Sequence, residues 1–215
     1  MDLSFPASKA CSLGVIILGA GASSRMGRPK LLLPWHGSSI IAHLIRQWQA
    51  LAAAQIVVVC RPMDVLMSAE LDRLSFPSAN RIINPDPERG MFSSIQCAAN
   101  WEGWQPDLSS WAIVLGDQPH LQADMLQTLL AFHARHPQSM CQPSHEGRGG
   151  HPILLPRTAF ARLRSAPTQT LNLFLKQNAD ALVQCPVADA RLGLDLDTPA
   201  DYKQLILNQQ ANEKR

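Results

Sequence analysis

The chain has 215 residues, of which 46% are hydrophobic, and it carries 19 Lys and Arg against 17 Asp and Glu. A chain of this length can bury one sizeable core. We therefore expect a single domain over residues 1–215, with the folded core at about 14–207 and loose ends at 1–12 and 208–215. The net charge of +2 comes from scattered cations, which argues against nucleic acid as a partner. No apolar run approaches the ~20 residues of a membrane span, so no membrane association is expected.

The five cysteines lie far apart and include no Cys-x-x-Cys pair. This spacing argues against a disulfide framework and against a zinc site, and it favours a reduced, cytoplasmic setting with mostly buried thiols. The apolar run Leu13–Ala22 could imitate the core of a signal peptide. Few cations precede it, however, and cleavage there would destroy the loop described below. We therefore predict a cytoplasmic protein.

Apolar runs alternate with stretches of helical periodicity along the chain. Strands are predicted at 15–18, 56–60, 81–83, 111–115, 139–142, 152–155 and 181–185, with a short extended segment at 31–34. Helices are predicted at 40–51, 63–74, 93–101, 122–136, 157–165 and 169–178, and a terminal helix is predicted to begin at Pro199 with Thr198 as its N-cap. The alternation predicts an α/β fold with a mostly parallel sheet covered by helices on both faces.

The segment after the first predicted strand combines small residues with cations. Residues 19–24 read Gly-Ala-Gly-Ala-Ser-Ser, which leaves the backbone N–H groups open to an anion. Arg25, Arg28 and Lys30 follow closely, and Pro29 helps to keep this part of the chain out of a regular helix. Long cations beside such a loop can neutralise several phosphate oxygens at once. We interpret the segment as a loop that binds a polyphosphate.

Other phosphate-binding loops fit this segment less well. A dinucleotide-binding fingerprint needs glycine or alanine where Ser24 stands and an acidic residue about 20 residues further on, where this chain has His43 and Arg46. A Walker A loop is excluded because Gly-Lys-Ser/Thr does not occur. The third interpretation is a nucleotidyltransferase loop, in which one segment holds both the nucleobase and the triphosphate. A tight glycine turn with surface charges is the non-functional alternative.

Three aspartates are candidate metal ligands. Asp117 follows the predicted strand 111–115, at the edge where parallel sheets bind ligands, and Mg²⁺ prefers oxygen donors that it shares with substrate phosphates. Asp195 and Asp197 lie on the same side if their segment is extended, so either could supply a second ligand. The alternatives are a turn before Pro119 and capping of the terminal helix.

A proline-rich loop leads into the helix predicted at 93–101. It contains Asn84, Ser93 and Ser94, whose polar groups could meet an anion or a nucleobase. Capping of the helix alone would also explain the two serines. This loop is therefore a candidate for nucleotide binding only in combination with the first loop.

Histidines occur in two further settings. The glycine-rich stretch 145–152 holds Arg148 and His151 and could touch an anionic second substrate, unless it is only a flexible hairpin. His133 and His136 are three residues apart on a predicted helix, but no third metal ligand accompanies them. We expect both of these histidines at the solvated surface.

Together these motifs resemble those of the molybdenum cofactor nucleotidyltransferases. The loop 18–30 is similar to their Leu-Ala-Ala-Gly-x-Ser-x-Arg-Met-Gly-x-x-Lys signature. Further motifs follow in the same order, namely Asn-Pro-Asp with Gly-Met-Phe-Ser-Ser (84–94), Gly-Asp-Gln-Pro (116–119), Gly-His-Pro (150–152) and Asp-Leu-Asp-Thr-Pro-Ala-Asp (195–201). The nearest resemblance, over roughly residues 14–207, is to the cytidylyltransferase branch, which joins CMP to molybdopterin.

The resemblance implies a Rossmann-like three-layer α/β/α sandwich of the nucleotide-diphospho-sugar transferase type. It also implies a Mg²⁺-dependent transfer of CMP from CTP to molybdopterin with release of pyrophosphate, and a molybdoenzyme that could receive the product. The catalytic residues would be Arg25, Lys30 and Asp117, with Asp195 or Asp197 as a further metal ligand. The nucleotide would contact Leu18, Gly19, Ala20, Gly21, Ser23, Ser24, Arg25, Lys30, Asn84, Ser93 and Ser94. The acceptor would contact Arg148, Gly150, His151 and Pro152.

One position departs from the signature, because Gly19 stands where the family usually has alanine. The guanylyl branch usually reads Leu-Ala-Gly-Gly, so Ala20 favours CTP, whereas Gly19 keeps GTP open as the donor. A sugar or alditol phosphate is an alternative acceptor. A nucleotide-binding chaperone for the cofactor is the alternative outside the enzymes, and the joint presence of Arg25, Lys30 and Asp117 argues against it.

Overall fold

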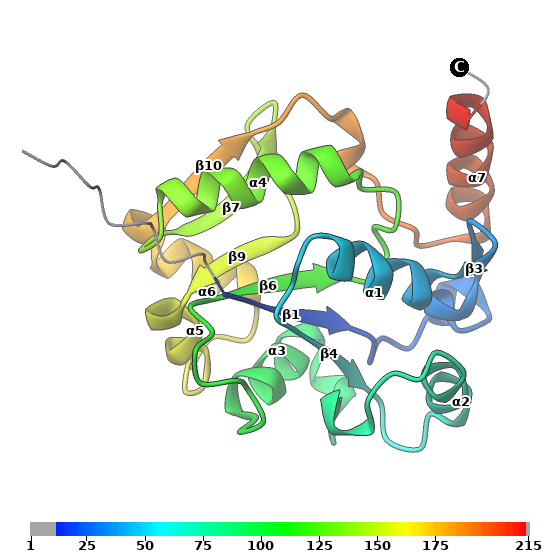
Figure 1. The fold of residues 1–215 in the computed structure, drawn as a ribbon, viewed down its shortest axis with the longest axis horizontal. Coiled ribbons are helices and arrows are strands. Elements are labelled where there is room, and N and C mark those ends of the chain that lie inside the picture. The colour runs from blue at the N-terminus through cyan, green and yellow to red at the C-terminus, as the bar shows by residue number, and fades with distance from the viewer. Residues whose placement is uncertain (1–11, 214–215) are drawn as a thin grey trace, which may run out of the picture.

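An eight-stranded sheet lies at the centre of the protein, with helices on both of its faces (Figure 1). The structure is a computed structural model that describes residues 12–213, apart from the side chains of Ser24 and of residues 209–213. The strand order is β10-β7-β9-β6-β1-β4-β5, and β8 pairs with β7. Of the loose ends predicted at 1–12 and 208–215, residues 1–11 and 214–215 lie outside the described residues.

The predicted elements all have counterparts in the structure. The strands of the main sheet are β1 (Leu13–Leu18), β4 (Gln55–Cys60), β5 (Arg81–Ile83), β6 (Ser110–Leu115), β7 (Met140–His145), β8 (Arg148–Gly149), β9 (Ile153–Pro156) and β10 (Leu182–Pro186). The helices are α1 (Ile40–Ala50), α2 (Val65–Arg73), α3 (Met91–Asn100), α4 (Ala123–Arg135), α5 (Arg157–Leu163), α6 (Leu171–Gln177) and α7 (Pro199–Glu213). The predicted α/β class is therefore confirmed.

The centre of the sheet consists of parallel strands. β1 pairs in parallel with β4 on one side and with β6 on the other. Val15, Ile16 and Ile17 in β1 are fully buried, as expected for a strand that is covered on both faces. β9 runs antiparallel to β6 and β7, so the sheet is mostly but not wholly parallel. The carboxyl ends of β1, β4 and β6 consequently meet at one edge.

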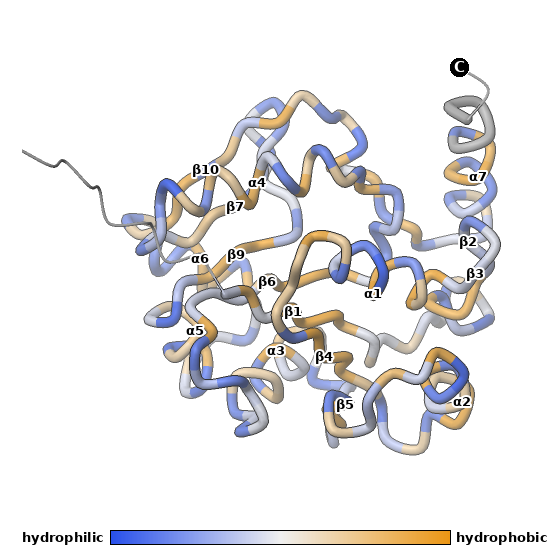
Figure 2. Tube along the Cα trace, viewed as in Figure 1, coloured by the Kyte–Doolittle hydropathy of each residue, from blue (hydrophilic) through white to orange (hydrophobic). Residues whose placement is uncertain are grey.

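Two apolar layers hold the helices against the sheet. Val15 and Ile17 belong to a layer with residues of α1, α4 and α7. Ile16 and Ile113 belong to the opposite layer, with residues of α3, α5 and α6. Figure 2 shows hydrophobic colours along the central strands. The arrangement confirms the predicted three-layer α/β/α sandwich.

Three local predictions differ from the structure. The segment predicted as extended at 31–34 begins instead as a 3₁₀ turn at Lys30–Leu32, and a hairpin of β2 (Pro34–Trp35) and β3 (Ser38–Ser39) follows it. Helix α3 begins at Met91 with Gly90 as its N-cap, before the predicted start at Ser93 or Ser94. Helix α7 continues to Glu213, where the sequence predicted a loose end from 208.

The placement of His133 corrects another prediction. Its side chain is buried, and Nε2 lies 2.7 Å from Ser110 Oγ while Nδ1 lies 3.4 Å from Cys141 Sγ. The prediction of a solvated surface residue was therefore wrong for His133. The imidazole of His133 can be buried on the apolar face of α4 because the Ser110 hydroxyl and the Cys141 thiol lie next to its two nitrogens.

The cysteines agree with the prediction of mostly buried thiols. Cys60, Cys141 and Cys185 are buried, and Cys97 is partly buried, all as free thiols. Burial raises the pKa of Cys60 to about 11 and that of Cys141 to about 12, so both thiols are unreactive near neutral pH. Within residues 12–213, no helix has the length and apolar character needed to cross a membrane.

Candidate functional site

Two adjoining pockets open at the carboxyl ends of the parallel strands, the edge at which α/β sheets bind ligands. The first pocket, of about 300 Å³, lies between the loop 19–30 and Asp117. The second pocket, of about 390 Å³, lies between residues 18–22 and the loop 87–94. Both pockets are lined by Leu18, Gly21, Ala22, Gly116 and Asp117. A ligand that fills both would therefore pass Asp117 where they meet.

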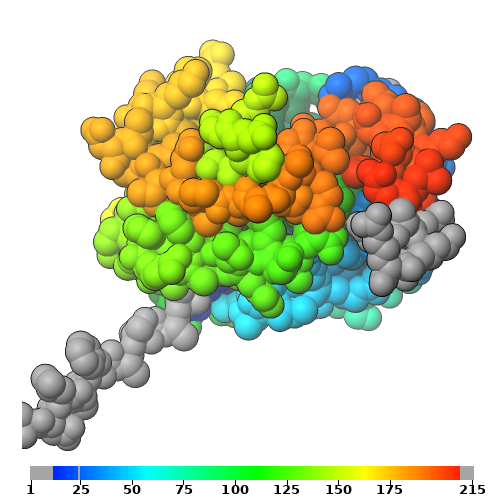
Figure 3. Space-filling model, turned by 90° about the horizontal axis from the view of Figure 1, so that it is seen from above, coloured from blue at the N-terminus to red at the C-terminus, as the bar shows by residue number. Residues whose placement is uncertain are grey.

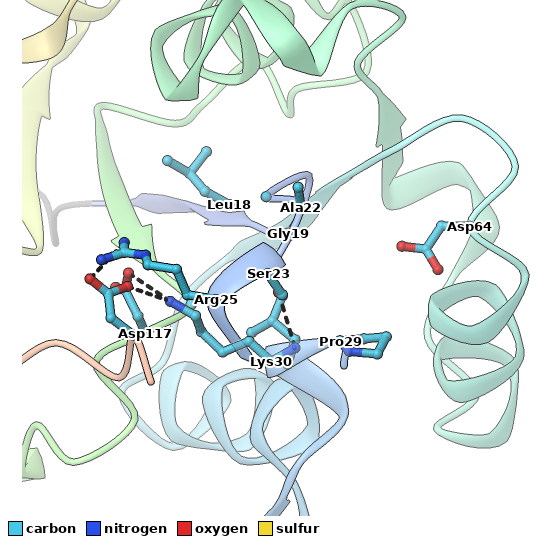
Figure 4. A pocket seen from close by; sticks show the side chains of 13 residues that line it. Leu18, Gly19, Ala22, Ser23, Arg25, Pro29, Lys30, Asp64 and Asp117 are labelled. Carbon is cyan, nitrogen blue, oxygen red and sulfur yellow. Dashed lines mark hydrogen bonds and ion pairs between the residues drawn. The ribbon is translucent and has the colours of Figure 1, made fainter. Parts of the chain in front are cut away.

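Opposite charges face one another in the first pocket (Figure 4). Lys30 Nζ lies 3.0 Å from Asp197 Oδ1 and 3.3 Å from Asp117 Oδ2. Arg25 Nη2 lies 2.8 Å from Asp197 Oδ2. Asp64 lines the same pocket and lies apart from this cluster in Figure 4. The structure thus brings two of the predicted cations together with two of the predicted carboxylates, although Lys30 and Asp117 are 87 positions apart in the sequence.

The conformation of the loop explains how Lys30 reaches these carboxylates. Gly19 N–H donates to the carbonyl of Val59 at 2.8 Å, and a Cβ at Gly19 would lie 3.0 Å from that oxygen. Ser23 adopts a left-handed conformation with φ of 51°, and its hydroxyl accepts a hydrogen bond from Lys30 N–H at 3.1 Å. Close approach to β4 therefore accounts for glycine at position 19, while Ser23 closes the loop.

The Asp117 carboxylate is slightly more enclosed than that of Asp197, with 25% against 29% of the side chain exposed. Burial raises the pKa of its carboxyl, and the nearby ammonium of Lys30 opposes that rise. Among the described residues, its Oδ1 is buried and has no hydrogen-bond partner. A buried carboxylate oxygen without a partner is costly unless a ligand or water completes it.

The segment before α7 carries the other two candidate aspartates. Figure 3 shows this orange stretch lying along the green surface of α4 and leading to α7. Leu196 N–H donates to the carbonyl of Asp117 at 2.9 Å, which places Asp197 in the first pocket. Asp195 Oδ1 accepts a hydrogen bond from Gln118 at 2.9 Å instead. In the described part of the chain, no three His, Cys, Asp or Glu side chains form a metal-binding cluster, so Asp195 and Asp197 stay predicted ligands.

A reciprocal capping interaction holds the start of α7. Thr198 Oγ1 accepts from Asp201 N–H at 3.2 Å, while Asp201 Oδ2 accepts from Thr198 N–H at 2.7 Å and from Asp197 N–H at 3.2 Å. This geometry confirms Thr198 as the N-cap. Because Asp201 also binds the backbone of Asp197, the cap fixes the carboxylate that faces Lys30.

The predicted residues of the second loop divide into two groups. Ser94 lines the second pocket, whereas Asn84 and Ser93 do not line either pocket. Asn84 is buried, and its amide donates to Ser93 Oγ at 2.8 Å and to Ser94 Oγ at 2.9 Å. Asn84 and Ser93 therefore brace the loop, and only Ser94 reaches the cavity. Whether any of them touches a nucleotide stays a prediction.

The predicted acceptor residues lie outside the lining of both pockets. Arg148 is exposed on β8, and Pro152 is buried directly before β9. Gly150 packs so closely that a Cβ there would lie 2.5 Å from Leu192. His151 Nε2 is buried without a hydrogen-bond partner among the described residues, and burial lowers the pKa of His151 to about 4. The structure therefore does not assemble this group with Lys30 and Asp117.

Several lining residues were not predicted. Arg61 and Glu88 line the second pocket together with Met91, and Asp64 lines the first. Arg61 directly follows β4, so its position after a buried strand was the signal that could have identified it. Side chains at the carboxyl ends of all parallel strands gather at one edge, whether or not they belong to a motif. The side chain of Ser24, a predicted nucleotide contact, lies outside the described residues.

Comparison with known proteins relates this geometry to a family. Residues 15–182 match the family model for the MobA-like NTP transferase domain. The chain belongs to this family. The MobA-like fold, of the nucleotide-diphospho-sugar transferase type, is shared with solved nucleotidyltransferases. The chain is accordingly a nucleotidyltransferase, as the sequence predicted.

Three members or neighbours of the MobA-like group are informative. The molybdenum cofactor cytidylyltransferase of Escherichia coli (strain K12) is 27% identical over 89% of this chain and 94% of that protein. The molybdenum cofactor guanylyltransferase of Xanthomonas euvesicatoria pv. vesicatoria (strain 85-10) is 37% identical over 54% of this chain and 52% of that protein. The solved structure of Rv0371c from Mycobacterium tuberculosis H37Rv has a TM-score of 0.76 at 21% identity and covers 91% of this chain and 98% of its own. Rv0371c was also crystallised in complex with manganese, with a TM-score of 0.67 at 18% identity over 91% of this chain and 98% of its own.

Proposed function

We propose that this MobA-like protein transfers CMP from CTP to a molybdopterin-type acceptor, with Mg²⁺ and release of pyrophosphate. The observation that carries the proposal is the convergence of Lys30 and Arg25 with Asp117 and Asp197 in the first pocket. Two cations suit a triphosphate, and two carboxylates suit a divalent metal. The E. coli relative that aligns over most of the chain is a cytidylyltransferase for the molybdenum cofactor.

The triphosphate of the nucleotide occupies the first pocket in this proposal. Lys30 and Arg25 exchange their carboxylate partners for phosphate oxygens, and the backbone of residues 21–23, which line this pocket, faces the anion. Lys30 is mostly buried, with 15% of its side chain exposed, so its charge acts in a medium of low dielectric. Arg25 is 68% exposed and contributes less.

The residues present fit a bound magnesium ion. Asp117 Oδ1 is buried and has no hydrogen-bond partner among the described residues. Such an oxygen suits coordination of a magnesium ion, which prefers oxygen ligands. Asp117 and Asp197 would hold the metal, and Asp195, engaged by Gln118, would support it from beside the site. The complex of Rv0371c with manganese supports a divalent cation at this fold. When bound, such an ion neutralises phosphate charge and orients the reacting groups.

The nucleoside occupies the second pocket. Its walls are mostly small or apolar, including Leu18, Ala20 and Leu115, with Ser94 as a hydroxyl contact. A flat nucleobase suits such a cavity. Ala20 favours CTP, because the guanylyl branch usually has glycine there. The structural reason found for Gly19 removes the main argument against CTP, since Gly19 approaches the carbonyl of Val59.

The acceptor approaches from the side of Gly150, His151 and Pro152, with Arg148 available for its phosphate. His151 stays neutral near pH 7 and has a buried nitrogen free to form a hydrogen bond within the described structure. A neutral ring nitrogen suits the polar edge of a pterin better than it suits a phosphate. The product would pass to a molybdoenzyme in the cytoplasm, where the free thiols of the chain stay reduced.

Catalysis in this proposal rests on positioning and charge. A phosphate oxygen of the acceptor attacks the α-phosphorus in line with the departing pyrophosphate, and no covalent enzyme intermediate forms. Lys30 and Arg25 stabilise the negative charge that grows on the leaving pyrophosphate. Asp117 and Asp197 orient the site, and the burial of Lys30 keeps water from weakening its charge.

The test is pyrophosphate release by purified protein with molybdopterin-form cofactor and Mg²⁺, comparing CTP, GTP and ATP. Release with CTP supports the proposal in full. Release with GTP alone would move the protein to the guanylyl branch. Tight nucleotide binding without release would indicate a sugar or alditol phosphate as the acceptor, or a nucleotide-binding chaperone.

A further inference from the structure

An ion pair forms part of the wall of the second pocket. Arg61 Nη2 lies 2.7 Å from Glu88 Oε1, and both residues line the pocket. Arg61 directly follows β4, while Glu88 lies in the 3₁₀ turn Pro87–Arg89 between β5 and α3. The pair therefore connects two loops that belong to different strands. Neither the loop 19–30 nor Asp117 takes part in it.

The surroundings of this pair suit a nucleobase. Leu18, Ala20, Met91 and Leu115 give the pocket apolar surfaces, against which a flat ring can pack. Arg61 and Glu88 add one cationic and one anionic group at the wall of the same cavity. A flat apolar body with a polar edge is the chemical description of a nucleobase.

We propose that Arg61 and Glu88 read the hydrogen-bonding edge of the base and select cytosine over uracil. This inference rests on the proposed function, because it requires the nucleoside to lie in the second pocket. A carboxylate only accepts hydrogen bonds, and a guanidinium only donates them. Cytosine presents one amino donor beside two acceptors, which matches one carboxylate beside one guanidinium. Uracil presents a carbonyl oxygen in place of the amino group, and that oxygen is repelled by a carboxylate.

The ion pair restricts the positions of the two side chains that would contact the base. Arg61 holds the Glu88 carboxylate through a charged hydrogen bond, so the acceptor and the donors keep a fixed arrangement. The Glu88 side chain is 75% exposed and that of Arg61 is 30% exposed, so water competes at this edge. We therefore expect a moderate selectivity, about tenfold. The ratio of CTP affinity to UTP affinity is the quantity that reports on this pair, because the two bases differ in the group that faces the carboxylate.

The experiment measures the affinity for CTP and for UTP by calorimetry, with Mg²⁺ and without acceptor. The variants are Glu88→Gln and Arg61→Gln, and Arg89→Gln serves as the control because it changes an exposed cation in the same turn that does not line the pocket. The amide that Glu88→Gln introduces can donate as well as accept. Glu88→Gln is therefore expected to lower the CTP preference about tenfold, mostly through tighter binding of UTP. Arg61→Gln is expected to weaken binding of CTP more than that of UTP.

The stability of the variants does not limit this test, because an exposed ion pair contributes little to folding. A CTP preference that stays within about twofold of the unmodified protein in both variants would overturn the inference while leaving the proposed function intact. An equal change of the CTP preference in Arg89→Gln would also overturn the inference, because the effect would then come from the net charge of the loop and not from a contact with the base. Failure of the unmodified protein to bind CTP would overturn the proposed function and this inference together.

Discussion

The two halves of the proposed site differ in how far the structure assembles them. In the nucleotide half, Lys30, Asp117 and Asp197 are already in contact within the first pocket. In the acceptor half, His151 lies outside both pockets, and Gly150 packs against Leu192. The residues of the nucleotide half follow parallel strands that end at one edge of the sheet. The residues of the acceptor half lie next to the hairpin of β7 and β8 and contact the segment before α7. In the proposed site, the nucleotide half is therefore more preorganised than the acceptor half.

The largest expected effect comes from breaking the assembled half. Lys30→Gln should lower kcat/KM by about a thousandfold, because it removes the buried cation that faces the triphosphate. Since Asp117 loses its ammonium partner, its carboxyl pKa should rise further and binding of Mg²⁺ should weaken. Steady-state kinetics with a thermal melt as the folding control measures this change. Near-normal kcat/KM in a folded variant would remove Lys30 from the site.

Acid should lower stability through two partly buried histidines, His151 in the acceptor half and His43 on α1, which lines neither pocket. Burial lowers the pKa of His43 and of His151 to about 4, whereas the unfolded chain takes up protons near 6.5. The unfolded state therefore binds more protons between these values, so the free energy of unfolding falls as pH drops from about 6.5 to about 4. The loss is at most about 3 kcal/mol for each histidine.

Chemical denaturation between pH 7.5 and pH 4.5 tests this point. His43→Phe and His151→Phe should each make the free energy of unfolding depend less steeply on pH. The larger change will identify the histidine whose pKa is lowered more in the folded protein. A profile that stays equally steep in both variants would contradict the assignment.

Two arginines of the same loop test which cations belong to the nucleotide half. Arg25 contacts Asp197 and lines the first pocket, whereas Arg28 is exposed and does not line it. Arg25→Gln should raise the KM for the nucleotide about tenfold through loss of a charged hydrogen bond, and Arg28→Gln should change it less than twofold. Equal effects of the two substitutions would indicate a general effect of loop charge instead of a defined contact.

The smallest effect is expected in the acceptor half. His151→Phe keeps the ring shape but removes a buried nitrogen that has no partner in the described structure, so stability should not fall. The KM for the acceptor should rise about fivefold, while the affinity for the nucleotide stays unchanged. A change confined to nucleotide affinity would assign His151 to the other half.

Sequence could predict that Lys30 and Asp117 lie close together because each comes after a strand of a parallel sheet. Once 15–18 and 111–115 are strands, Lys30 and Asp117 are expected at the same edge, and the structure places them 3.3 Å apart. This prediction was possible because the two strands can be recognised from their apolar residues alone, and a parallel sheet then sets which edge the following residues reach. The same reasoning could have identified Arg61, which also directly follows a strand.

The features that the sequence did not reveal depend on contacts between distant segments. Burial of His133 depends on Ser110 and Cys141, which lie on two different strands. The bracing role of Asn84 depends on the side chains of α3, and the packing of Gly150 depends on Leu192. Helical spacing or a motif cannot reveal such partners, because they are set by tertiary packing.

The most direct test of the account is Mn²⁺ binding by electron paramagnetic resonance, with and without CTP, in the unmodified protein and in Asp117→Asn. Without nucleotide, Lys30 and Arg25 occupy the carboxylates, so Mn²⁺ should bind weakly. With CTP, the cations should move to phosphate, and Mn²⁺ affinity should rise at least tenfold in the unmodified protein and much less in Asp117→Asn. Equal Mn²⁺ affinity with and without CTP, or an equal rise in Asp117→Asn, would contradict the claim that the first pocket binds the metal and the triphosphate together.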